Sequence, residues 1–176
     1  MSSAELDPEL RLTETSYIVL GLLEQIEPAT PYDVKQVAQL STANFWALPH
    51  TQLYTECARL ASEGLLDEQR EQTGRRRRIY RLTERGRAHL DAWRGVVESD
   101  HYELRDEATL KLFFGADPKA LAASQIESHK ARLKVYEQLR KRVDGIPRGQ
   151  QLALDCGIGH EREFIRFWSR IAAGED

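Results

Sequence analysis

The spacing of apolar residues predicts four helices in the first half of the chain. Thr13 is a suitable N-cap for a helix that ends before Pro28, because proline disfavours the α conformation in the residue preceding it. Pro31 opens a second, shorter helix, and Pro49 opens a third. Thr83 caps a fourth helix, which carries further apolar residues at helical spacing.

Two short segments between the third and fourth helices predict a β-hairpin. Residues 65–71 and 77–82 each alternate in the manner of a strand, and Gln72-Thr73-Gly74 between them contains the glycine that a hairpin turn favours. Three helices followed by a hairpin are the parts of a winged helix-turn-helix. We therefore expect a mainly α fold with a small β-hairpin wing, followed by a C-terminal helical domain.

The sequence beyond about Val97 predicts helix, with breaks at residues 115–118 and 144–147. Apolar positions recur there at alternating steps of four and three, the spacing of a coiled-coil-like seam. We expect these stripes to pair with a second copy of the chain through Ile126, Leu133, Tyr136, Ile165 and Trp168. The alternative is that these helices fold back onto the winged domain.

The pattern thus divides the chain into three parts. We expect residues 1–12 to be a polar, flexible N-terminal arm, residues 13–97 a winged helix-turn-helix DNA-binding domain, and residues 98–176 a helical dimerisation domain.

Net positive charge is concentrated in one segment of the chain, which the total charge does not show. The formal net charge is −3, yet residues 70–87 contain eight arginines and two glutamates. A basic segment on an otherwise acidic molecule suits the docking of one face on a polyanion. The alternative is a solvated turn that happens to be rich in arginine.

The start of the third helix carries side chains that can contact base edges and phosphates. In a helix-turn-helix the second helix of the motif lies in the major groove, and its N-terminal residues reach the bases. Gln52 suits adenine, Thr51 a thymine methyl, and His50 guanine or phosphate. Tyr54 and Thr55 suit phosphate contacts. An ordinary solvent-exposed first turn is the alternative for His50 and Gln52.

The hairpin tip supplies four consecutive cations. They can straddle a phosphate backbone or enter a narrow minor groove, and they are Arg75, Arg76, Arg77 and Arg78. Lys35 on the second helix and Arg59 on the third could add phosphate contacts, but the sequence favours solvated surface charge for both.

Other classes of protein receive little support. The five histidines show no metal-ligand spacing, and neither a glycine-rich phosphate loop nor a nucleophile elbow is present, so we expect no enzyme, cofactor or metal. Cys57 and Cys156 lie far apart, and no apolar run resembles a signal peptide or a membrane span, which indicates a cytoplasmic protein. A winged-helix module that binds protein remains the main alternative, and RNA binding is a weaker one.

Several blocks resemble the PadR family of bacterial transcriptional regulators, in its long form with a helical C-terminal dimerisation domain. The blocks are Leu12 to Leu23, Ala29 to Lys35, Phe45-Trp46 with His50 to Tyr54, Leu60 to Leu66, Tyr80 to Gly86, Phe113 to Gly115 before Asp117-Pro118, and Trp168. The resemblance implies a repressor that binds an inverted repeat near a promoter and is released by a small molecule or another signal. Two positions depart from the family pattern, since Pro31 stands where glycine is frequent and Cys57 where leucine is usual.

The effector is the least determined part of the prediction. Trp46, Trp93, Tyr102 and Phe113 could line an apolar pocket for a small aromatic compound between the winged and helical parts. The alternative for each of these aromatic residues is an ordinary place in the core.

Overall fold

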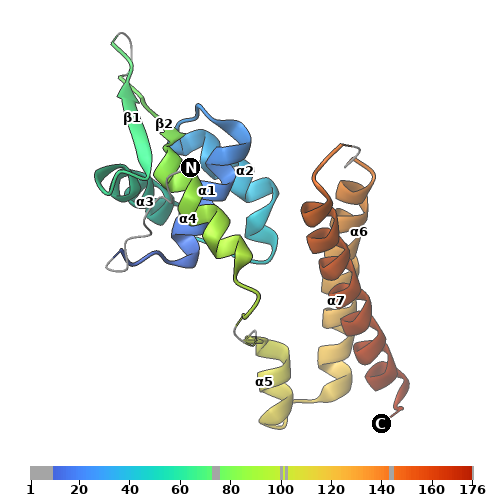
Figure 1. The fold of residues 1–176 in the computed structure, drawn as a ribbon. Helices are drawn as coiled ribbons and strands as arrows, with labels where there is room; N and C mark the ends of the chain where they lie inside the picture. The colour runs from blue at the N-terminus through green and yellow to red at the C-terminus, as the bar shows by residue number, and fades with distance from the viewer. Residues whose placement is uncertain (1–9, 73–75, 100, 102, 143–144, 176) are drawn as a thin grey trace. The chain divides into compact units, whose positions relative to one another are not determined.

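The computed structural model describes residues 10–72, 76–99, 101, 103–142 and 145–175, except for the side chain of His50. The chain forms two compact units, residues 1–100 and 101–176. The first contains a wing and is called the winged unit below, and the second is called the helical unit (Figure 1).

The winged unit has the predicted order of elements. They are α1 (Glu14–Ile26), α2 (Pro31–Leu40), a short 3₁₀ helix (Thr42–Asn44), α3 (His50–Ser62), β1 (Leu66–Arg70), β2 (Arg78–Leu82) and α4 (Glu84–Gly95). The side chains of Thr30 and Thr83 accept hydrogen bonds from backbone N–H groups in the first turns of α2 and α4. The expected cap at Thr13 is confirmed as well, since α1 begins at the next residue.

The wing is an antiparallel hairpin that projects from the helices (Figure 1). Its register runs from Leu66 opposite Leu82 at the root to Arg70 opposite Arg78 near the tip. Ala29, between α1 and α2, exchanges two backbone hydrogen bonds with Tyr80 of β2, at 2.8 and 3.1 Å. This bridge attaches the wing to the helical part of the same unit.

The winged unit has one continuous apolar core to which every helix of the motif and both strands contribute. Its buried members are Val19, Leu20, Leu22, Leu23, Ala29, Val34, Ala38, Leu53, Cys57, Leu60, Leu65, Leu66, Tyr80, Leu82 and Leu90. Leu53 and Cys57 of α3 are both buried in this core. Burial of this apolar surface is the main term that stabilises the unit.

The helical unit consists of α5 (Glu107–Phe113), α6 (Pro118–Arg140) and α7 (Arg148–Ala173), with α6 and α7 packed as a long antiparallel pair (Figure 1). The expectation that helix continues from Val97 is wrong for residues 97–99, 101 and 103–106, since α4 ends at Gly95 and α5 begins only at Glu107. Asp106 explains where α5 starts. Its carboxylate accepts hydrogen bonds from the backbone N–H groups of Ala108 and Thr109, which places Asp106 at the N-cap.

The predicted seam of the C-terminal helices packs α6 against α7. The buried side chains of the two helices are Ala122, Tyr136, Ile158, Glu161 and Trp168. Tyr136 and Trp168 are two of the five seam residues that the sequence predicts. A polar pair lies between the two helices, with Nδ1 of His129 2.6 Å from Oε2 of Glu161. The His129 ring also stacks on Phe164 at a centroid distance of 4.7 Å. The seam is therefore used within one chain.

Candidate nucleic-acid interface

Helix α3 has one buried face and one exposed face. Leu53, Cys57 and Leu60 are buried in the core, whereas the side chains of Tyr54 and Thr55 between them are exposed. Thr51, Gln52, Tyr54 and Thr55 are exposed, as base or phosphate contacts require. The Thr55 hydroxyl donates to the carbonyl of Thr51 at 3.0 Å. His50 begins the helix, and its side chain lies outside the described part of the structure.

A polar network attaches α3 to α1. Ser16 of α1 is fully buried, and its hydroxyl donates to Oε1 of Glu56 at 2.6 Å and accepts from Nη2 of Arg59 at 3.0 Å. Arg59 also donates to both carboxylate oxygens of Glu56. Arg59 therefore holds α3 to α1, a role that the sequence did not indicate because Ser16 and Arg59 lie 43 residues apart.

The pKa of Glu56 reflects this network. Partial burial alone would raise the pKa of the Glu56 carboxyl, but the hydrogen bonds from Arg59 and Ser16 outweigh burial and hold it below its ordinary value. The carboxylate is therefore charged at neutral pH and fixes the orientation of α3 relative to α1.

The described arginines at the wing tip, Arg76, Arg77 and Arg78, are exposed, and two of them are paired with carboxylates. Nε of Arg77 lies 3.2 Å from Oε2 of Glu71, and Nη1 of Arg78 lies 3.5 Å from Oε2 of Glu68. Within the described residues no ion pair involves Arg76, which has a positive φ of 48°. Arg75 lies outside the described residues.

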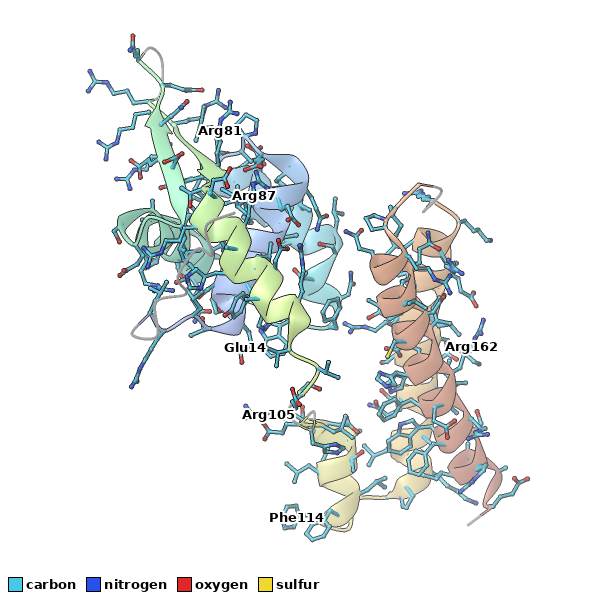
Figure 2. The ribbon with its side chains drawn as sticks, viewed as in Figure 1. Glu14, Arg81, Arg87, Arg105, Phe114 and Arg162 are labelled. Atoms are coloured by element: carbon cyan, nitrogen blue, oxygen red, sulfur yellow. The ribbon has the colours of Figure 1, made fainter. Side chains whose placement is uncertain are left out.

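Glu27 fixes the root of the wing. One of its carboxylate oxygens accepts from the backbone N–H of Leu82 at 2.6 Å, and the other accepts from Arg87 of α4. A single carboxylate thus joins the end of α1 to β2 and to α4, and the labelled Arg87 lies beside the wing root (Figure 2). No sequence spacing could reveal this contact, because Glu27 and Leu82 are 55 residues apart.

The remaining predicted DNA contact and the predicted effector residues belong to several segments of the two units. Lys35 is half-buried on α2. Trp46 is exposed, and Trp93 stacks on Tyr17 with a centroid distance of 4.6 Å and an interplanar angle of 10°. Phe113 belongs to the helical unit and is exposed, and Tyr102 lies outside the described residues. The effector pocket therefore stays a prediction.

The residues predicted to contact a second chain fall into two groups, one buried and one half-buried. Trp168 and Tyr136 are buried within the helical unit of a single chain, and Ile126, Leu133 and Ile165 are half-buried. Other large apolar side chains of this unit are exposed instead, namely Leu104, Leu110, Phe113, Phe114, Val135, Leu152 and Phe167. Phe114 projects from the end of α5 (Figure 2).

A metal site, a membrane-spanning helix and a reactive cysteine each have structural requirements against which the described residues can be compared. Among those residues no three His, Cys, Asp or Glu side chains gather as a metal ion would require. None of the helices described is both long and apolar enough to cross a membrane. Burial raises the pKa of the Cys57 thiol to about 12, so this cysteine is an unreactive core residue.

Two protein families match the chain, one in each unit. The transcriptional regulator PadR-like family matches residues 19–92, and the virulence activator alpha C-terminal family matches residues 104–173. The negative transcriptional regulator PadR of Bacillus subtilis (strain 168) is 24% identical over 173 residues, which cover 89% of this chain and 94% of that protein.

Solved structures share the fold over nearly the whole chain. Bacillus subtilis PadR in complex with operator DNA matches with a TM-score of 0.80 and 24% identity, over 92% of this chain and 98% of that one. The same regulator in complex with p-coumaric acid matches with a TM-score of 0.75 and 22% identity, over 94% of this chain and 99% of that one. These likenesses confirm a winged helix-turn-helix followed by a helical domain.

Proposed function

We propose, because the chain belongs to the PadR-like family of transcriptional regulators, that it represses transcription as a homodimer bound to an inverted-repeat operator. The family consists of regulators and not of enzymes. Family membership also disfavours the alternative of a winged-helix module that binds only protein.

The observation that carries the proposal is that one compact unit exposes both the first turns of α3 and the arginines of the wing. The first turns of α3 present Thr51 and Gln52 to solvent while the opposite face of the helix is buried. The wing presents Arg77 and Arg78, and its root is attached to α1 and α4 through Glu27. The proposed division of roles is that α3 reads base edges in the major groove and the wing contacts phosphates.

Homodimerisation is proposed for the helical unit. Its large exposed apolar side chains gain a buried environment only against another surface, and an inverted repeat requires two-fold symmetry. Ile126, Leu133 and Ile165 are half-buried and are proposed contacts of that interface, whereas Tyr136 and Trp168 are already buried within one chain. Light scattering on the purified protein should give twice the chain mass, and a monomer at micromolar concentration would contradict the proposal.

DNA binding is tested by fluorescence anisotropy with labelled DNA from upstream of the gene and a scrambled duplex of equal length. Binding should favour the native duplex and weaken steeply as salt rises, because each phosphate contact releases counterions. The Arg77→Ala/Arg78→Ala variant should lower the slope of log K against log salt by roughly 0.9 for each phosphate that the wing no longer neutralises.

The matched control is Arg105→Ala/Arg162→Ala, which removes two exposed arginines of the helical unit. This control should leave affinity and slope unchanged. Equal affinity of the wild-type protein for native and scrambled duplexes, together with no preferred site in genome-wide selection, would contradict sequence-specific regulation.

A small aromatic effector is proposed as the releasing signal. The relative from Bacillus subtilis has been crystallised with p-coumaric acid, and this chain places the exposed Trp93 ring in a stack with Tyr17. Addition of p-coumaric acid should quench tryptophan fluorescence and release the native duplex. The Trp93→Phe variant should reduce the quenching, and equal affinity of the effector for free and DNA-bound protein would contradict this mechanism.

A further inference from the structure

One face of the wing changes from apolar at the root to cationic at the tip. Residues two apart on a strand point to the same face, so Glu68 and Arg70 of β1 lie on one face with Arg78 and Tyr80 of β2. Arg70 and Arg78 are directly opposite each other in the register. Like charges in this position repel, and the pair needs a counter-charge to be held together.

Glu68 supplies that counter-charge. Its Oε1 lies 2.9 Å from Nε of Arg70, and its Oε2 lies 3.5 Å from Nη1 of Arg78 and accepts from the Tyr80 hydroxyl at 2.9 Å. The hydrogen bond from Arg70 lowers the pKa of the Glu68 carboxyl more than partial burial raises it. The hydrogen bond from the Tyr80 hydroxyl lowers this pKa further. Glu68 is therefore an anion at neutral pH.

The two arginines remain accessible although they are paired. The side chains of Arg70 and Arg78 are 64% and 48% exposed, whereas that of Glu68 is 21% exposed. A DNA phosphate can approach either guanidinium, but it must compete with Glu68 for the same N–H groups. It is also repelled by the Glu68 carboxylate.

We infer that Glu68 determines DNA selectivity by restraining Arg70 and Arg78 against sequence-independent phosphate contacts. The inference rests on the proposed function. Binding to non-specific DNA depends almost entirely on phosphate contacts, so a carboxylate that occupies two wing arginines weakens that binding most. On the operator, the contacts of α3 with the bases hold the wing in one position. Arg70 and Arg78, which Glu68 already orients, then lose less conformational entropy on binding a phosphate than unrestrained arginines would.

The test is Glu68→Gln, which keeps the size of the side chain and removes its charge. This variant should bind the scrambled duplex several-fold more tightly, and its salt slope on that duplex should steepen by roughly 0.9 for each additional phosphate that the wing neutralises. Affinity for the native duplex should rise less, so the ratio of native to scrambled affinity should fall. A gain in affinity is informative because partial unfolding would produce a loss.

Asp67→Asn is the matched control. It removes the same charge from the adjacent residue of β1, on the opposite face of the strand, and Asp67 has no ion pair with a wing arginine within the described residues. This variant should change the affinity for scrambled DNA less than Glu68→Gln does. In an Arg70→Gln/Arg78→Gln background, Glu68→Gln should give no further gain.

Three results would overturn the inference: unchanged or weaker binding of Glu68→Gln to scrambled DNA, a gain equalled by Asp67→Asn, or a gain that persists without the two arginines. If Glu68→Gln lowers the Tm, the comparison is repeated with Glu68→Asp, which withdraws the carboxylate by one methylene and should show a smaller gain. A wild-type protein without preference for the native duplex would contradict the proposed function. A wild-type preference that Glu68→Gln leaves unchanged would contradict only this inference.

Discussion

The two units of the chain bury their apolar side chains to very different extents. The winged unit closes one core to which four helices and both strands contribute. In the helical unit, the corresponding cluster has only Ala108, Ala122 and Trp168 as buried members, and Phe113 and Phe114 are 82% and 76% exposed. The winged unit therefore carries the information for its own fold, whereas the exposed apolar side chains of the helical unit favour completion of its core by another surface.

The largest effect is expected where the small core of the helical unit depends on one side chain. Trp168→Ala should destabilise that unit by about 3–5 kcal/mol, the usual range for a buried aromatic residue. Thermal unfolding followed by circular dichroism should show an early loss of part of the helical signal, and light scattering should show a loss of dimer. The neighbouring Phe167 is 38% exposed, and Phe167→Ala should cost the unit less. Equal costs for the two variants would contradict the distinction between buried and exposed aromatic residues.

A smaller loss of stability is expected for a substitution at Gly86, where α4 packs against the backbone of Leu65 beside the wing root. A Cβ atom at Gly86 would lie 2.2 Å from the backbone carbonyl oxygen of Leu65, so Gly86→Ala should destabilise the winged unit by roughly 1–3 kcal/mol. Gly95 of the same helix has no atom within 4 Å of such a Cβ, and Gly95→Ala should be neutral or slightly stabilising. Urea unfolding monitored by circular dichroism measures both. An unaltered midpoint for Gly86→Ala would show that the wing root is loosely packed.

The smallest effect concerns the network between α1 and α3 and depends on pH. The pKa of Glu56 is lower in the folded protein than its ordinary value of 4.5, so the carboxylate stabilises the fold above that value. This contribution is lost as the pH falls from about 4.5 through the lower folded pKa. Glu56→Gln should cost about 1 kcal/mol at pH 7, and this cost should decrease as the pH falls from 4.5 through the lower folded pKa. Denaturant unfolding at a series of pH values measures the change, and a cost that stays constant would argue against the ionised network.

The sequence predicts the parts of this fold that depend on local signals. Capping residues such as Thr13 and Thr83 predict where helices begin, and the alternation in residues 77–82 predicts the second strand. The start of α5 was not predicted, although Asp106, with its carboxylate on the N–H groups of the first turn, was the available signal.

The contacts that position the candidate interface could not be predicted from spacing. Glu27 meets Leu82, and Ser16 meets Glu56, only because tertiary packing brings distant segments together. The wing arginines were recognisable as a run of charge. Their pairing with Glu68 and Glu71 depends on the register of the hairpin and on side-chain conformations, which the run of charge does not contain.

The most direct test of the account is selection of bound duplexes from a random DNA library, with the wild-type protein and with Thr51→Ala/Gln52→Ala. We predict that the wild-type protein enriches an inverted repeat whose half-sites are centred about 34 Å apart, one helical turn of DNA, or a multiple of it. The variant should relax the preference at the positions that α3 contacts and retain the same spacing. Failure of the wild-type protein to enrich any sequence, or a variant that selects the same bases as the wild-type protein, would contradict recognition of an operator by the exposed face of α3.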